Sequence, residues 1–207
     1  MSSRRTLVAL ATAAATAVAV LSVAGPANAS TAHYVALGDS YASGLGAGNY
    51  GSSGSCDRSA GAAAQLWANA NSPASFTFAA CSGATTSDVL NSQLGSLNTG
   101  TTLVSLIIGG NDVGFSSTMT DCVLFSTSTC VSEINSDEAQ ANAVLPGRYD
   151  NLLNTIKAKA PNAKIVFMDY PDFYDLNVFC IGLSATDHQK IDEGINLLDS
   201  LIQQAAA

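Results

Sequence analysis

Positive charge is scarce in this 207-residue sequence, which has 8 Lys and Arg residues against 16 Asp and Glu residues and a formal net charge of −8. Nucleic acids and anionic membranes attract proteins mainly through clustered Lys and Arg side chains. So acidic a chain argues against both as electrostatic partners. The charge balance suits a soluble exported protein and carries no information about chemistry.

Metal and nucleotide motifs are also missing. The sequence has only two histidines, His33 and His188, and its five cysteines form no Cys-x-x-Cys pair, so we predict no metal site. A phosphate-binding G-x-x-x-x-G-K-[ST] loop is absent. The segment GAGNYG (46–51) matches G-x-G-x-x-G, but it starts eight residues after the preceding strand ends and no helix pattern follows it. We therefore predict a surface loop over Gly46–Ser55 and no cofactor.

The first 29 residues have the order of a secretory signal peptide. Two arginines near the start precede the apolar run Leu7–Val23 and the small-x-small site Ala27–Ala29. We expect cleavage near Ala29 and secretion by the general or the twin-arginine route. Stable membrane insertion is not expected, because the apolar run is short for a membrane span. Residues 30–207 then form one domain with 6 basic and 16 acidic residues, a net charge of −10.

All five cysteines lie in the part of the chain that follows the leader. Export favours disulfides, and an odd number of cysteines leaves one unpaired. A Cys122–Cys130 disulfide would close a small loop, and a Cys56–Cys81 disulfide a larger one. Cys180 is then the cysteine left over.

The apolar pattern predicts alternating strands and helices. Strands are expected over Tyr34–Leu37, Phe76–Ala80, Leu103–Ile108 and Lys164–Met168. All but the second are continuously hydrophobic, which predicts strands of a parallel sheet that are buried on both faces. Helices are expected over Ala60–Ala70, Ser87–Leu97, Arg148–Ala160 and Asp187–Ala205, with a second surface loop over Asp121–Cys130. This alternation predicts a doubly wound α/β fold that binds ligands at the carboxyl ends of its strands.

Residues suited to acyl transfer follow the first three strands. Ser40 lies where a strand gives way to a presumed helix, whose amino end favours nearby negative charge. Gly83 offers a backbone N–H that no side chain blocks, and Asn111 offers a side-chain amide. Acyl transfer requires a nucleophile together with donors aimed at the oxyanion. With the Ser40 N–H as third donor, this edge of the sheet predicts a serine nucleophile beside an oxyanion hole.

Three segments resemble the first three sequence blocks of the SGNH, or GDSL-type, hydrolases: GDSYASG (38–44), CSGATTSDV (81–89) and GGNDVGF (109–115). The likeness is closest to secreted actinobacterial esterases and lipases, which share a six-cysteine arrangement. It implies Ser40 as nucleophile and oxyanion donor, and Gly83 and Asn111 as further oxyanion donors. It also implies that Asp39 holds the loop, that the fold is a three-layer α/β/α sandwich with a flavodoxin-like parallel sheet, and that no cofactor is needed. The substrate implied is a small-molecule or lipid ester, and we expect a monomer.

The fourth block of that family, an Asp-x-x-His that supplies the general base near the carboxyl terminus, is missing from this sequence. A strand after the last helix and a partner for Cys180 are missing from the same region. We therefore expect a truncated form of a longer chain, with a sheet that lacks its last strand and impaired hydrolysis of p-nitrophenyl butyrate. His33 would lie about 20 Å from Ser40, at the wrong end of the sheet. We expect His188 to be exposed in the first turn of the last helix, capped by Ser184 or Thr186.

Simpler interpretations stay open for each residue alone. Ser40 could cap a helix, Gly83 could serve a turn, and Asn111 could order its loop. Their coincidence at adjacent strand ends favours catalysis. The three aspartates of segment 169–175 fit a solvated acidic rim better than a carboxylate pair for glycoside hydrolysis. Two hypotheses remain: a secreted serine ester hydrolase of the esterase or lipase type, or a catalytically silent secreted binding domain on the same fold.

Overall fold

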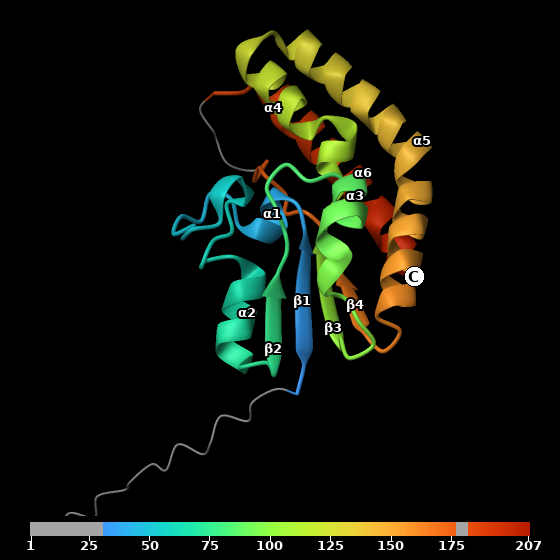
Figure 1. Ribbon diagram of the computed structural model, residues 1–207. Coiled ribbons are helices and arrows are strands. Elements are labelled where there is room, and N and C mark those ends of the chain that lie inside the picture. Colours follow the sequence, from blue (N-terminus) through green and yellow to red (C-terminus); the bar gives the residue numbers. More distant parts are fainter. Residues whose placement is uncertain (1–30, 177–181) are drawn as a thin grey trace, which may run out of the picture.

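The computed structural model describes residues 31–176 and 182–207, so the predicted leader and Cys180 lie outside the described residues. The centre of the fold is a parallel sheet with the strand order β2-β1-β3-β4. Its strands are β1 (His33–Gly38), β2 (Ser75–Phe78), β3 (Leu103–Ile107) and β4 (Lys164–Phe167). All four predicted strands are present, and their parallel pairing confirms the predicted α/β fold (Figure 1).

Helices connect the strands and cover both faces of the sheet (Figure 1). They are α1 (Ser40–Ser43), α2 (Ala63–Asn71), α3 (Thr86–Asp88), α4 (Phe115–Leu124), α5 (Thr127–Lys159) and α6 (Ala185–Ala206). α3 continues through a π-helical turn, Val89–Gln93, and a 3-10 turn, Leu94–Ser96. The helix predicted over Ser87–Leu97 is therefore present in an irregular form.

The two faces of β1 show how the layers are built. Successive side chains of a strand point to opposite faces. Tyr34 and Ala36 pack with α2 in a small cluster on one face. Val35 and Leu37 point to the other face, where they join the larger core that includes side chains of α5 and α6. The sheet therefore lies between two helical layers, as the sequence predicts.

β4 is less buried than its sequence predicts. Ile165 and Phe167 pack against the larger core, on the side of α5 and α6. Lys164 and Val166 point to the other face, and Val166 is 36% exposed. The cluster around α2 on that face reaches β1, β2 and Leu103 of β3 but no residue of β4, so the described chain leaves the face open at β4. The prediction that this strand is buried on both faces is wrong.

The helix predicted over Arg148–Ala160 is the second half of α5, which is 33 residues long. Pro146 and Gly147 usually end a helix, and for that reason the sequence pattern starts after them. The helix continues through both residues because its apolar face does not stop there. Leu145 and Tyr149, one helical turn apart, are both fully buried.

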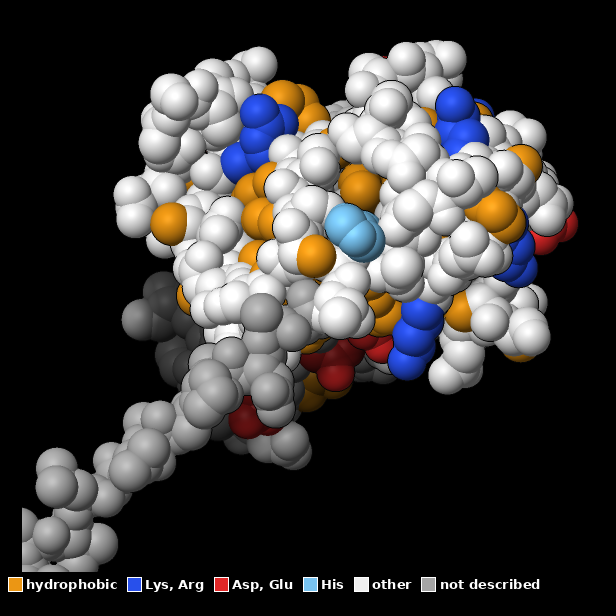
Figure 2. All heavy atoms as spheres, turned by 60° about the horizontal axis from the view of Figure 1, so that its bottom comes forward, with side chains coloured by type: hydrophobic (Ala, Val, Ile, Leu, Met, Phe, Trp, Pro, Cys, Tyr) orange, Lys and Arg blue, Asp and Glu red, His pale blue; other side chains and the backbone are white. Residues whose placement is uncertain are grey.

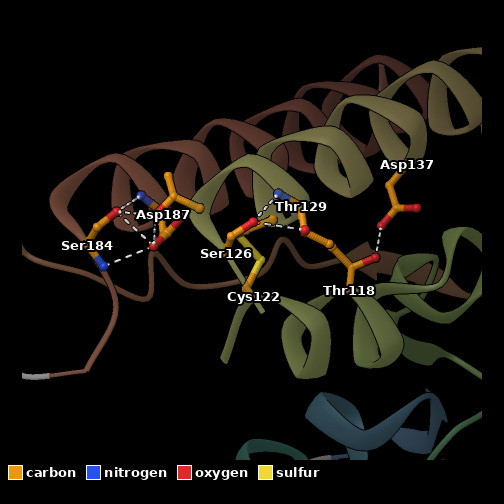
Figure 3. Close-up of a disulfide and its surroundings, with 9 residues drawn as sticks. Thr118, Cys122, Ser126, Thr129, Asp137, Ser184 and Asp187 are labelled. Atoms are coloured by element: carbon orange, nitrogen blue, oxygen red, sulfur yellow. Dashed lines mark hydrogen bonds between the residues drawn. A yellow bond between two sulfur atoms is a disulfide. The ribbon is translucent and has the colours of Figure 1, made fainter. Parts of the chain in front are cut away.

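The segment Asp121–Cys130, predicted to be a loop, is mostly helical. Only Phe125 and Ser126 separate α4 from α5. The Ser126 side chain caps α5 by accepting a hydrogen bond from the Thr129 N–H at 3.3 Å (Figure 3). The many Ser and Thr residues predict a loop, but they serve a helix cap and its first turn. We call this tight connection the α4–α5 corner.

Both predicted disulfides are present. Cys122–Cys130 joins the two helices of the α4–α5 corner (Figure 3). Cys56–Cys81 ties the end of the Gly46–Ser55 segment, which is a loop as predicted, to the turn after β2. Within residues 31–176 and 182–207, no helix is both long and apolar enough to cross a membrane.

Candidate active site

Ser40 lies at the carboxyl end of β1 as the first residue of α1. The cap of this helix is Asp39, whose carboxylate accepts a hydrogen bond from the Tyr41 N–H at 2.9 Å. The simpler interpretation of Ser40 as a helix cap therefore fails, because the residue before it has that role. The Ser40 side chain takes part in none of the hydrogen bonds found among the described residues.

The sharp bend before Ser40 depends on Gly38 and on its neighbours in space. Gly38 has a φ of +130°, and a Cβ at this position would collide with the carbonyl oxygen of Ile107 in β3. The same close approach lets the Asp39 N–H donate to the Ile107 carbonyl at 3.0 Å. The Gln93 side chain binds both the N–H and the carbonyl of Gly38, each at 2.8 Å. Nothing in the sequence distinguishes Gln93 from an ordinary polar residue of its helix.

Gly83 lies in the turn after β2, beside the bend that carries Ser40. The Cys81 N–H donates to the Gly38 carbonyl at 3.0 Å, which connects the two loops directly. Gly83 is exposed, has a φ of +80°, and has open space where a Cβ would stand. Its N–H makes none of the hydrogen bonds found in the described part of the chain. The turn interpretation of Gly83 is correct, and it also leaves the N–H accessible.

Asn111 lies after β3, in the 3-10 turn Gly110–Val113. Its Nδ2 donates to the Ala84 carbonyl at 3.0 Å, one residue after Gly83. An amide nitrogen carries two hydrogens, so one remains for another acceptor. The loops after β1, β2 and β3 are therefore linked in series, and the structure brings together the loops of all three predicted site residues.

The loop that carries Asn111 is fixed mainly through the next residue. The Asp112 carboxylate is fully buried and accepts hydrogen bonds from the Thr86 N–H at 2.9 Å and the Thr86 hydroxyl at 2.6 Å. Arg148 of α5 forms an ion pair with it at 2.7 Å. Gln140, also of α5, donates to the Asp112 carbonyl at 2.9 Å. Sequence reasoning missed this network, because its members lie up to 62 residues apart in the chain.

Two buried tyrosines hold the same loop from other sides. The Tyr149 hydroxyl donates to the Ile108 carbonyl at 3.0 Å. The Tyr170 hydroxyl accepts the Gly110 N–H at 3.1 Å and donates to the Asp39 carboxylate. Tyr170 follows β4, so residues from three strand ends meet at one hydroxyl group.

Asp39 sits in an environment that disfavours its charged form. Burial raises the pKa of its carboxyl group to about 6, although hydrogen bonds from Tyr170 and the Tyr41 N–H oppose this shift. Burial also raises the pKa of the Tyr170 hydroxyl well above its ordinary value, and the nearby carboxylate of Asp39 adds to the effect. The Asp39 and Tyr170 side chains both form hydrogen bonds that hold the Ser40 bend. This structural role is the one expected for Asp39.

The comparisons with known proteins agree with this geometry. Residues 36–207 match the GDSL-like Lipase/Acylhydrolase family. The chain belongs to this family. It is 52% identical over 202 residues to Lipase 1 of Streptomyces coelicolor (strain ATCC BAA-471 / A3(2) / M145), which covers 97% of this chain and 75% of that protein.

Two solved structures are also similar to this GDSL-like chain. Phospholipase A1 from Streptomyces albidoflavus NA297 is 53% identical, with a TM-score of 0.82 over 84% of this chain and 74% of the other. An extracellular lipase from Streptomyces rimosus is 44% identical, with a TM-score of 0.81 over 84% of this chain and 75% of the other. These relatives make the GDSL-like chain a carboxylic ester hydrolase by family.

In the described part of this GDSL-like chain, none of the contacts found for its two histidines involves Ser40. His33 is exposed at the start of β1, as predicted, and its Nδ1 lies 2.9 Å from the Ser75 hydroxyl at the opposite end of the sheet. His188 is buried, which contradicts the expected exposure. Its ring stacks on Tyr174 with 4.0 Å between the ring centroids. Of the two predicted caps for α6, Ser184 is the one observed (Figure 3).

The surface around the site is polar beside Asn111 and acidic in the loop after β4. An open hollow of about 460 Å³ lies beside Asn111, lined by Thr85, Thr86, Ser87, Leu90, Asp112, Arg148 and Asn151. Asp169, Asp172 and Asp175 after β4 are exposed, as predicted for an acidic rim. Among the described residues, no three His, Cys, Asp or Glu side chains are placed to hold a metal ion.

Proposed function

We propose that this chain is an exported serine hydrolase of carboxylic esters, of the esterase or lipase type, with Ser40 as its nucleophile. Export follows cleavage near Ala29, which leaves a single domain from residue 30 and a soluble monomer. The substrate class is a small-molecule or lipid ester, in line with the names of the relatives. The observation that carries the proposal is the linked set of loops that bears Ser40, Gly83 and Asn111 at one edge of the sheet.

The chemistry follows from the unpaired groups at that edge. The Ser40 oxygen attacks the ester carbonyl carbon, and the carbonyl oxygen becomes an oxyanion. The N–H groups of Ser40 and Gly83 and the second amide hydrogen of Asn111 donate to it. Collapse of this intermediate breaks the ester bond, the alcohol leaves with a proton, and the acyl group stays on Ser40. Water then attacks the acyl-enzyme and releases the acid.

A general base in hydrogen-bond reach of the Ser40 hydroxyl speeds the transfer of its proton. His188 does not meet this condition, because its ring is buried against Tyr174. We therefore expect His188→Ala to leave the rate of Ser40 acylation within about twofold of the original. Removal of a base from a serine hydrolase leaves about 10³-fold catalysis or more from the oxyanion hole and binding alone. Acylation of Ser40 is thus measurable whether or not a base takes part.

The test is mass spectrometry of the chain after incubation with p-nitrophenyl butyrate. We expect one butyryl group on the peptide that contains Ser40, and no such group in Ser40→Ala. Asn111→Ala should slow acylation about 100-fold, the usual cost of one lost oxyanion donor. Ser87→Ala, an exposed serine beside the same hollow, is the matched control and should acylate normally.

Two results would contradict the proposal. One is acylation that persists in Ser40→Ala at the original rate, because the label would then sit elsewhere. The other is saturable binding of an ester with no acylation and no turnover, because that behaviour belongs to a silent binding domain on the same fold.

A further inference from the structure

Three consecutive bulky hydrophobic side chains project from the α4–α5 corner into water. Val123, Leu124 and Phe125 are 64%, 67% and 62% exposed. Single exposed hydrophobic residues are common, whereas a group of consecutive exposed apolar side chains is a candidate contact surface. We call these three residues the apolar corner.

The apolar corner is held by ordered structure. Cys122, just before it, forms the disulfide with Cys130, and both cysteines are buried (Figure 3). Ser126, just after it, caps α5. Thr127 connects the start of α5 to the start of α6 by a hydrogen bond to Asp187 at 3.1 Å. The three hydrophobic side chains therefore lie on a turn whose backbone is already fixed between two helices. Binding through them should cost little conformational entropy.

The apolar corner lies at the same end of the molecule as the proposed nucleophile. Figure 1 shows the turn between α4 and α5 beyond the arrowheads of the strands, where α1 and Ser40 also lie. Figure 2 shows the opposite end, where several Lys and Arg side chains are visible and hydrophobic side chains form small groups among polar atoms. A surface that the apolar corner binds would face the carboxyl edge of the sheet.

The charges around the apolar corner restrict what it binds. The sequence has no Lys or Arg between Arg58 and Arg148, and Asp121 is the only charged residue in segment 115–132. Binding to anionic lipid or to an acidic partner normally uses Lys and Arg near the contact. Segment 115–132 provides none, so we expect its contact with a partner to be apolar and to depend little on salt.

The size of the apolar corner argues against a second protein. Three side chains of this size expose no more than a few hundred Å² together. A stable protein interface buries about 800 Å² on each partner, so this protrusion is too small for a stable dimer. Bulky side chains on a convex turn are suited to insertion among acyl chains, which adapt to their shape.

We propose that the apolar corner, Val123, Leu124 and Phe125, inserts into an electrically neutral lipid surface and holds the carboxyl edge of the sheet against it. This inference rests on the proposed function, because an ester hydrolase bound in this way meets its substrate in an aggregated lipid. The lipid surface concentrates the ester at the end of the molecule that carries Ser40.

The test is co-sedimentation of the full chain with phosphatidylcholine vesicles, in a Ser40→Ala background so that no ester is consumed. Burial of each of these side chains is worth about tenfold in partition, so the triple change Val123→Ser, Leu124→Ser, Phe125→Ser should weaken binding about 1000-fold. Leu124→Ser alone should weaken it about tenfold. Leu66→Ser is the matched control: Leu66 lies in α2, is 54% exposed, and should change binding less than twofold. Binding should be the same at low and high salt and no tighter to vesicles that contain phosphatidylglycerol.

Three results would overturn the inference: no binding of the parent chain to phosphatidylcholine, equal binding of the triple variant, or loss of binding at high salt. A dimer that dissociates in the triple variant would also overturn it, because a second copy would then be the partner. Acylation by soluble p-nitrophenyl butyrate separates this inference from the proposed function. If the parent chain binds vesicles through the apolar corner but Ser40 is never acylated, the proposed function fails and the lipid contact stands.

Discussion

The loops after β3 and β4 lie at the same edge of the sheet, but they are held in different ways. The loop after β3 is largely buried and receives hydrogen bonds from side chains of α5, through Gln140 and Tyr149. The loop after β4, residues 169–176, exposes its aspartates. It attaches to α6 through two of its backbone N–H groups, one to Asp199 at 2.9 Å and one to Asp192 at 3.3 Å.

The difference shows how the site geometry is specified. The loop that carries Asn111 takes its shape from side chains of other elements, so its geometry is a property of the tertiary structure. In the loop after β4, the Tyr170 hydroxyl group bonds to Gly110 and Asp39, and the Phe173 ring stacks on Tyr41 beside Ser40. The two loops should therefore respond very differently to the loss of one carboxylate.

The largest effect is expected from Asp112→Ala in the loop after β3. The change leaves the N–H and the hydroxyl of buried Thr86 without their acceptor. Each unsatisfied buried group costs roughly 1–3 kcal/mol, so the free energy of unfolding should fall by about 4 kcal/mol. Acylation of Ser40 should also slow, because Asn111 loses its fixed position. Urea denaturation and the acylation assay measure the two effects.

Arg148→Ala is the matched control for this variant, because it removes the other partner of the same ion pair. The Arg148 side chain is 45% exposed, so water can replace part of the contact. The carboxylate of Asp112 stays buried but keeps its hydrogen bonds to Thr86, so we expect a loss of about 2 kcal/mol, smaller than in Asp112→Ala. Equal losses in the two variants would show that the ion pair, and not the hydrogen bonds to Thr86, holds the loop.

These contacts also mark what a sequence can and cannot predict. Apolar runs located all four strands, and local composition located Ser40, Gly83 and Asn111 at the strand ends. The network around Asp112 stayed hidden because burial of a polar residue depends on neighbours that are distant in the chain. The length of α5 was missed because Pro146 and Gly147 locally oppose a helix, which only the buried face on either side of them outweighs.

The burial of His188 was missed for a similar reason. Polar residues in the first turn of a helix are usually exposed, and nothing local shows that Tyr174 packs against this one. The same holds for the exposed face of β4. Continuous hydrophobicity predicts cover on both sides, but whether a helix lies over the strand is decided by the path of the whole chain.

A second, smaller effect is expected from Asp39→Asn, and it appears as a change in pH dependence. Burial raises the pKa of Asp39 from 3.8 to about 6. Between these values the folded chain binds more protons at this residue than the unfolded chain, so stability falls as the pH rises. The fall should total roughly 3 kcal/mol, since one pKa unit corresponds to about 1.4 kcal/mol. Asn still caps α1, so the variant should lose this slope when denaturation is measured from pH 4 to 7.

Tyr170→Phe tests the same pH dependence of stability through a residue that follows β4. The Tyr170 hydroxyl opposes the rise in the pKa of Asp39, so its removal should raise that pKa further and extend the slope to higher pH. If stability falls with pH just as steeply in Asp39→Asn, another group causes the pH dependence. Asp39 would then not be the titrating group that connects the loops after β1 and β4.

The smallest effect is expected from Asp172→Asn in the loop after β4. Burial raises the pKa of Asp199, and the negative charges of Asp169 and Asp172 add to this rise. The variant should lower the pKa of Asp199 slightly in an NMR titration. Asp172 is exposed, so the free energy of unfolding should change by less than about 0.5 kcal/mol. A loss comparable to that of Asp112→Ala would mean that each loop is held by a carboxylate of its own, and the contrast between them would not stand.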